Sequence, residues 1–108
     1  MNEDAFWKLI KAPKGRLRSN LAYQYQERLI RRLSKRPAQD IIWFESWFDH
    51  FIQMAQTAEL QAAARIMQPD MDEAGFLDFR GWLVCQGKKA YYSCLKSPAK
   101  LTKMVKPH

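Results

Sequence analysis

An acidic stretch in the second half of this 108-residue sequence partly matches the loop with which helical proteins bind calcium. With Asp70 at position one of the loop, Asp72 falls at position three and Asp78 at position nine. Ala74 and Gly81 then occupy positions five and twelve, where the calcium loop needs an oxygen ligand and a bidentate glutamate. We therefore interpret the carboxylates as helix N-caps and as favourable charges at the positive end of a helix dipole, and we predict no metal site.

Two cysteines and one internal histidine could supply a thiol nucleophile with its base, or three metal ligands. Cys85 and Cys94 are nine residues apart, whereas zinc motifs separate paired cysteines by about two to four residues. No second internal histidine accompanies His50. We therefore expect packing roles instead, with His50 partly buried at the edge of the aromatic stripe and Cys85, which lies off the main apolar arc, facing a neighbouring helix or solvent.

Two acidic residues, Glu45 and Asp49, are four residues apart and could imitate a pair of catalytic carboxylates on one helix face. Such a pair needs a cleft that raises the pKa of one member, and we expect a solvated or salt-bridged polar face instead. The sequence contains no Gly-rich phosphate loop, no Gly-x-Ser-x-Gly motif and no His-Glu-x-x-His motif. We therefore predict that the protein is not an enzyme and needs no cofactor.

Arg80 falls among the apolar side chains of its predicted helix, near Phe76, Leu83 and Val84 on a helical wheel. A guanidinium group in that position requires a partner. We expect an ion pair with a carboxylate of the central helix or of the acidic turn, with the aliphatic stem of Arg80 lying along apolar surface. The alternative is that Arg80 anchors an anion in a cleft.

Four basic residues, Arg28, Arg31, Arg32 and Lys35, fall within about 100° of arc on one predicted helix, beside its apolar stripe. Such a face can be merely solvated, can dock a protein partner with an acidic surface, or can bind nucleic-acid phosphates. No known DNA-binding pattern and no RNA-stacking sheet accompanies these residues. We therefore prefer the protein partner and keep nucleic acid as the alternative.

Helices must position these residues, because only four glycines and five prolines occur and no Asn-Gly or Asp-Gly hairpin signal is present. A first short helix is predicted to begin near Asn2 and to end before Pro13. A second is predicted to begin at Ser19 or Asn20 and to stop before Pro37. Its apolar residues recur at four-residue steps, at Leu21, Tyr25, Leu29 and Leu33.

A third helix, with Pro37 in its first position, is predicted to form the centre of the fold. Its apolar side chains cover about half of the helical circumference, which indicates packing on more than one side. These side chains are Ile41, Trp43, Phe44, Trp47, Phe48, Phe51, Ile52, Met54 and Ala55. The remaining narrow polar face carries Glu45, Asp49 and Gln53.

Shorter helices are predicted to complete the chain. Thr57 can cap an Ala-rich helix over 58–67, and Asp70 or Asp72 can cap a fifth helix that closes at Gly87 in the left-handed conformation. The buried side of this fifth helix is predicted to carry Phe76, Phe79, Trp82 and Leu83.

Two short terminal helices over 88–95 and 98–105 end the predicted fold. The expected fold class is therefore all-α: a single compact domain over 1–108, with about five to seven helices around a central aromatic-rich helix.

The formal net charge is +7, but basic and acidic residues occur in separate blocks along the chain. Residues 1–36 hold ten basic and three acidic side chains, residues 37–78 hold one and eight, and residues 79–108 hold seven and none. Part of each basic block, Arg80 included, is therefore expected to neutralise the central acidic block within the fold. Only the basic residues that are not neutralised in this way need to face a partner.

The expected location is the cytoplasm. Two cysteines are too few for a disulfide framework, and the acidic first residues do not match a signal peptide. No apolar run approaches the roughly 18 residues that a membrane helix needs, so we expect no membrane association.

Three segments of the sequence, Glu3–Ile10, Trp43–Phe48 and above all Gly75–Gly87, resemble the bacterial family called domain of unknown function 4240. The most specific part is Gly-Phe-x-x-Phe-Arg-x-Trp-Leu-x-x-Gln-Gly within the last of them. The resemblance covers nearly the whole chain and implies a small helical bacterial protein, but it implies no activity. The chain departs from the family before Gly75, where Asp70 and its neighbours replace a Gly-Cys-Ser-Asp-Asp stretch.

We therefore expect a small non-enzymatic protein-interaction module of the regulatory, adaptor or immunity type, with its oligomeric state left open. The alternative is a nucleic-acid-binding protein that uses the basic face of the second helix.

Overall fold

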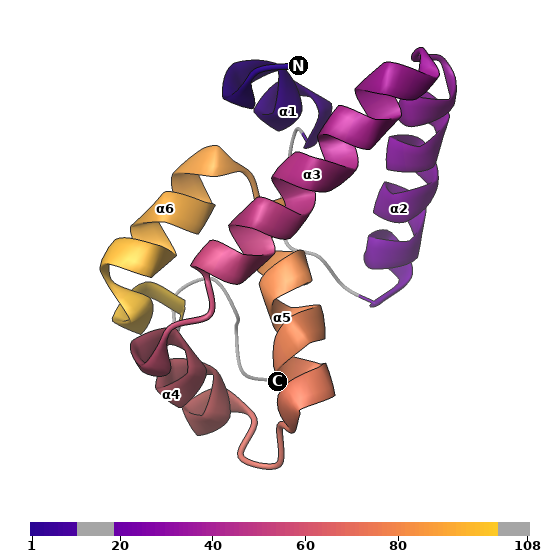
Figure 1. The fold of residues 1–108 in the computed structure, drawn as a ribbon. Helices are drawn as coiled ribbons and strands as arrows, with labels where there is room; N and C mark the ends of the chain where they lie inside the picture. Colours follow the sequence, from indigo (N-terminus) through magenta and orange to yellow (C-terminus); the bar gives the residue numbers. More distant parts are fainter. Residues whose placement is uncertain (11–18, 102–108) are drawn as a thin grey trace.

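Six α-helices and a short 3-10 helix carry the described part of the chain (Figure 1). The computed structural model describes residues 1–10 and 19–101, with side chains over 1–10 and 27–101. The elements are α1 (Glu3–Ile10), α2 (Ser19–Ser34), α3 (Ala38–Met54), α4 (Ala58–Met67), α5 (Glu73–Cys85), α6 (Lys88–Lys96) and η1 (Pro98–Lys100). No strand occurs among these residues, which confirms the predicted all-α fold and its number of helices.

Local capping signals explain where several helices begin. The side chains of Asn2, Thr57 and Asp72 accept hydrogen bonds from main-chain N–H groups three residues ahead, at 2.8, 3.1 and 2.8 Å. Each bond satisfies one of the N–H groups that the first turn of a helix leaves without a partner. The predicted caps Thr57 and Asp72 are thus confirmed, and Asp72 rather than Asp70 begins α5.

The structural roles of Pro37 and Gly87 differ slightly from those predicted. Pro37 immediately precedes α3 instead of starting it, with an extended ψ of 154°. Gly87 has the positive φ of 101° that glycine tolerates best, but its ψ of 165° is extended and it leads directly into α6.

Aromatic rings join α1, α3 and α6 in the core. Phe6 of α1 lies 4.9 Å from Phe44 of α3, and Trp7 lies 4.8 Å from Phe51, measured between ring centroids. Tyr91 of α6 meets Phe51 edge-on at 5.4 Å. All five side chains are buried, so this cluster holds α1 and α6 against the central helix α3.

The helix α5 approaches α3 closely at a glycine. A Cβ atom added to Gly81 would lie 3.9 Å from Phe48 and 4.0 Å from Ile52, in ordinary van der Waals contact. The buried side of α5 carries Phe76 and Leu83 as predicted, while Phe79 and Trp82 pack partly buried beside the core.

The apolar stripe of α3 is covered less than its width predicts. Phe44, Phe51 and Ala55 are buried, and Trp47, Phe48 and Ile52 pack partly buried against the core. The flanking side chains Ile41, Trp43 and Met54 are exposed. Ile41 and Trp43 lie at the N-terminal end of α3, which projects beside α2 beyond α1, α5 and α6 in Figure 1, whereas Met54 lies in the last turn at the flank of the apolar stripe.

Several predictions concern residues outside the described part of the chain. These are the loop around Pro13 and Gly15, the side chains of Leu21 and Tyr25, and the terminal helix beyond residue 101. Within the described ranges, no helix is both long and apolar enough to cross a membrane.

Candidate functional site

The basic face predicted on α2 divides into two parts. Arg28, Arg31 and Lys35 are exposed, whereas Arg32 is only half-exposed. Nη1 of Arg32 donates a hydrogen bond to the carbonyl oxygen of Leu9. This carbonyl belongs to the last turn of α1, where acceptors lack intrahelical donors and a positive charge is favourable. Arg32 therefore fixes α2 to α1, and three of the predicted cations remain for a partner.

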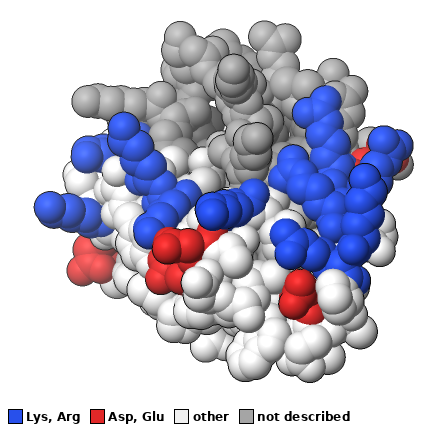
Figure 2. All heavy atoms as spheres, turned by 90° about the horizontal axis from the view of Figure 1, so that it is seen from above, with Lys and Arg blue, Asp and Glu red and all other residues white. Residues whose placement is uncertain are grey.

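Figure 2 shows the Lys and Arg side chains on the upper side of the molecule in two groups, one on the side of α2 and one on the opposite side, with acidic side chains beside both. Arg36, at the α2–α3 connection, forms an ion pair with Asp40 at 3.6 Å. Lys88 of α6 pairs with Asp4 of α1 at 3.6 Å. Such exposed pairs contribute little to stability, but they reduce the positive charge that a partner would meet.

Exposed apolar side chains lie in the same hairpin as the three cations. Ile30 of α2 is 64% exposed, and Ile42 and Trp43 of α3 are 57% and 45% exposed. A single exposed apolar residue needs no explanation, but a group of them beside charged residues is typical of interaction sites. We call the exposed side chains of this segment the basic hairpin; its members are Arg28, Arg31, Lys35, Ile42 and Trp43, whereas Ile30 lies about 100–160° around α2 from the three cations and is left out.

Arg80 is buried as predicted, at 7% exposure, but its partners differ from those predicted. Nη1 donates to the carbonyl oxygen of Ile52 at 2.9 Å, and Nε donates to that of Phe76 at 3.4 Å. The guanidinium carbon lies 4.8 Å from the centre of the Phe76 ring. No carboxylate of the described residues lies within ion-pair distance of Arg80, so the expected ion pair is wrong.

The physical reason lies at the C-terminal end of α3. Ile52 belongs to the last turn of this helix, whose carbonyl groups lack intrahelical donors and carry the negative end of the helix dipole. A guanidinium group supplies both a hydrogen-bond donor for these carbonyl groups and a positive charge at the negative end of the dipole. Tyr91 of α6 acts similarly, because its hydroxyl donates to the carbonyl oxygen of Phe51. Sequence reasoning missed Tyr91, since its spacing carries no signal for a main-chain partner.

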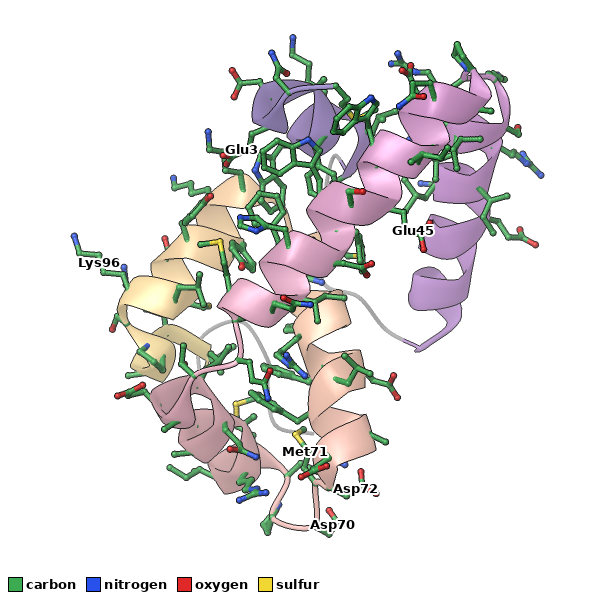
Figure 3. All side chains as sticks on the ribbon, in the orientation of Figure 1. Glu3, Glu45, Asp70, Met71, Asp72 and Lys96 are labelled. Atoms are coloured by element: carbon green, nitrogen blue, oxygen red, sulfur yellow. The ribbon has the colours of Figure 1, made fainter. Side chains whose placement is uncertain are left out.

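Glu3 connects α1 to α6. Its Oε2 atom accepts hydrogen bonds from Nε1 of Trp7 at 3.0 Å and from the hydroxyl of Tyr92 at 2.9 Å. Figure 3 shows Glu3 between α1 and α6. Burial, followed by this hydrogen bond and by the charge of Glu3, raises the pKa of Tyr92 to about 12. Tyr92 is therefore a neutral donor near neutral pH.

The predicted chemical groups of the sequence do not come together. Within the described part of the chain, no three His, Cys, Asp or Glu side chains are placed to hold a metal ion. Glu45 and Asp49 are exposed on α3. His50 is exposed as well, so its expected partial burial is wrong, although its ring meets that of Phe51 edge-on at 5.2 Å. Cys94 is buried in the core, and this burial raises the pKa of its thiol, whereas Cys85 is half-buried.

The comparison with protein families decides what kind of chain this is. A family model described as "Protein of unknown function (DUF4240)" matches residues 1–108. The chain belongs to the DUF4240 family. The resemblance predicted from the segment Gly75–Gly87 is thereby confirmed, and in this DUF4240 protein that segment forms α5 with Arg80 at its centre. Neither the curated proteins nor the solved structures contain a match.

Proposed function

We propose that this DUF4240 protein is a non-enzymatic, cytoplasmic protein-interaction module whose basic hairpin docks a protein partner with an acidic surface. The observation that carries the proposal is the exposure of Arg28, Arg31 and Lys35 on α2, followed by the exposed apolar side chains Ile42 and Trp43 at the start of α3. Apolar side chains supply contact area that excludes water, and the surrounding charges select and orient the partner.

The composition of the surface favours a protein over a nucleic acid. A phosphate-binding face gains from cations alone, whereas Glu27 and Asp40 lie within the same hairpin and Arg32 is occupied by α1. The exposed Ile42 side chain offers nothing to a phosphate backbone. A partner that presents both carboxylates and apolar side chains matches each component of the basic hairpin.

The direct test is capture of partners from extracts of the cell in which the chain is native. The immobilised wild-type protein is compared with the triple variant R28E/R31E/K35E, which reverses the three exposed charges. The matched control is K89E/K96E/K100E, which reverses three exposed cations of α6 and η1 and changes the net charge equally. We expect the wild type and the control to retain the same partner, and the hairpin variant to lose it.

Two outcomes would contradict the proposal. Equal loss of capture in both variants would mean that net charge, not the basic hairpin, determines binding. Binding to generic DNA or RNA that depends on the hairpin would support the nucleic-acid alternative. Three phosphate contacts should then weaken this binding about 40-fold between 50 and 200 mM salt.

A further inference from the structure

A second hairpin, at the opposite end of the molecule, has the opposite charge. The segment 66–79, which contains the turn between α4 and α5, holds four acidic residues and no basic one. All four are exposed: Asp70, Asp72, Glu73 and Asp78. Figure 3 shows Asp70 and Asp72 at this turn, and Met71 between them is buried. The turn is thus anchored by Met71 and presents its carboxylates to solvent.

Apolar side chains accompany these carboxylates as well. Ile66 of α4 is 79% exposed and Leu77 of α5 is 48% exposed. Glu73 and Leu77 are four residues apart on α5 and therefore lie next to each other on its surface. We call this surface the acidic hairpin; its members are Ile66, Asp70, Asp72, Glu73, Leu77 and Asp78.

The two hairpins complement each other in charge and in apolar character. The segment 27–40 of the basic hairpin holds five basic and two acidic residues, against four acidic and none basic in 66–79. Figure 1 shows the α2–α3 connection at the top of the molecule and the α4–α5 connection at the bottom. Surfaces at opposite ends of one rigid chain cannot reach each other, but they can meet between two copies.

We infer that the partner of the basic hairpin is a second copy of this chain, which docks through its acidic hairpin in a head-to-tail arrangement. This inference rests on the proposed function, since it names the acidic partner that the basic hairpin would bind. A head-to-tail contact is heterologous, so it leaves one hairpin unfilled at each end of a pair. Further copies therefore add until a ring closes or an open chain forms.

The test measures self-association by sedimentation velocity, over a range of protein and salt concentrations. The monomer has a mass of 12.8 kDa. We expect the wild type to exceed this mass increasingly as its concentration rises at low salt, and to return to it as salt screens the charges. The control K89E/K96E/K100E is expected to behave like the wild type.

Charge-reversed variants identify the two surfaces. R28E/R31E/K35E makes both hairpins acidic, and D70K/E73K/D78K makes both basic while leaving the capping residue Asp72 in place. Each variant alone should associate at least about 100-fold more weakly than the wild type, because like charges then face each other. An equimolar mixture should recover the association, since opposite charges meet again at every junction. Circular dichroism confirms that each variant is folded.

The outcomes separate this inference from the proposed function. A wild type that stays monomeric at all concentrations, or a mixture that does not recover, overturns the head-to-tail pairing. If R28E/R31E/K35E nevertheless loses a partner captured from extract, the proposed function stands with a different acidic protein as its partner. Self-association that neither reversal weakens would also overturn the head-to-tail pairing, and the proposed function would then be decided by the capture from extract alone.

Discussion

Replacing Arg80 by methionine should destabilise the protein because it removes the guanidinium group while keeping most of the aliphatic stem. The carbonyl of Ile52 then loses its donor at the end of α3. A hydrogen bond from a charged group contributes about 1.5–3 kcal/mol, and the contact with the Phe76 ring adds about 0.5–2 kcal/mol. We therefore expect the free energy of unfolding to fall by about 3 kcal/mol.

Urea denaturation measures this loss. With a slope of about 1.5 kcal/mol/M for a domain of this size, the midpoint should fall by about 2 M urea. Arg31→Met is the matched control, since Arg31 is exposed and its replacement should change the free energy of unfolding by no more than about 0.5 kcal/mol. An Arg80→Met variant as stable as this control would refute the role of the guanidinium group.

The pH dependence of the same comparison identifies the partner of Arg80. Carbonyl oxygens do not titrate, so the difference between wild type and Arg80→Met should persist from about pH 7 to about pH 2. A carboxylate paired with Arg80 would have a lowered pKa and would become protonated towards the acid end of this range, where the difference would shrink. A difference that disappears at low pH would therefore restore the ion pair and contradict the structure.

Three further predictions concern helix caps, glycines and pH. Asp72→Ala should lower the free energy of unfolding by about 1 kcal/mol through loss of the α5 cap, whereas Asp70→Ala should change it little; urea denaturation of both variants checks this. Gly81→Ala should raise the free energy of unfolding by about 0.5–1 kcal/mol, because its Cβ fits in ordinary contact with α3 and alanine favours the helix. Gly75→Ala should gain less, since its Cβ would lie only 3.2 Å from the capping oxygen of Asp72; thermal unfolding of the pair compares them. The pKa of Tyr92 is raised to about 12, so its contribution to stability should be complete below pH 10 and be lost as the pH rises through 12. Tyr92→Phe should flatten that decline in urea unfolding measured from pH 9 to 12, and an unchanged decline would contradict the assignment.

Local signals made the helix boundaries predictable. Thr57 and Asp72 act within three residues of their own positions, so the sequence contains the whole of each cap. Pro37 lies one position before the start that its residue type predicts for α3, because a proline can either precede a helix or begin it.

Which side chains of each helix are buried by neighbouring helices was harder to predict. The apolar residues of α3 define a sector of the helix, but the sequence does not say how far neighbouring helices extend along it. Ile41 is therefore exposed although it lies three residues before buried Phe44 on the same stripe, and Trp43 is exposed at the edge of that stripe. Trp43 also belongs to the basic hairpin, a contribution that the charge pattern alone did not reveal.

The partners of the buried arginine were missed for a related reason. Reasoning from side chains looks for a carboxylate to match each buried cation, whereas Arg80 and Arg32 are both bound by carbonyl groups at helix ends. Every helix ends with such acceptors, but only the tertiary arrangement shows which donor reaches them. The central acidic block is accordingly not neutralised by Arg80, and much of it faces solvent at the acidic hairpin.

The central claim is that the basic hairpin contacts another protein, and photo-crosslinking in living cells tests it most directly. A photoreactive amino acid is placed at Ile42, within the basic hairpin, and separately at Lys89, an exposed position on α6. The account predicts a discrete protein crosslink from position 42 that R28E/R31E/K35E abolishes, and no equivalent crosslink from position 89. Crosslinks to nucleic acid alone, or the same products from both positions, would contradict it.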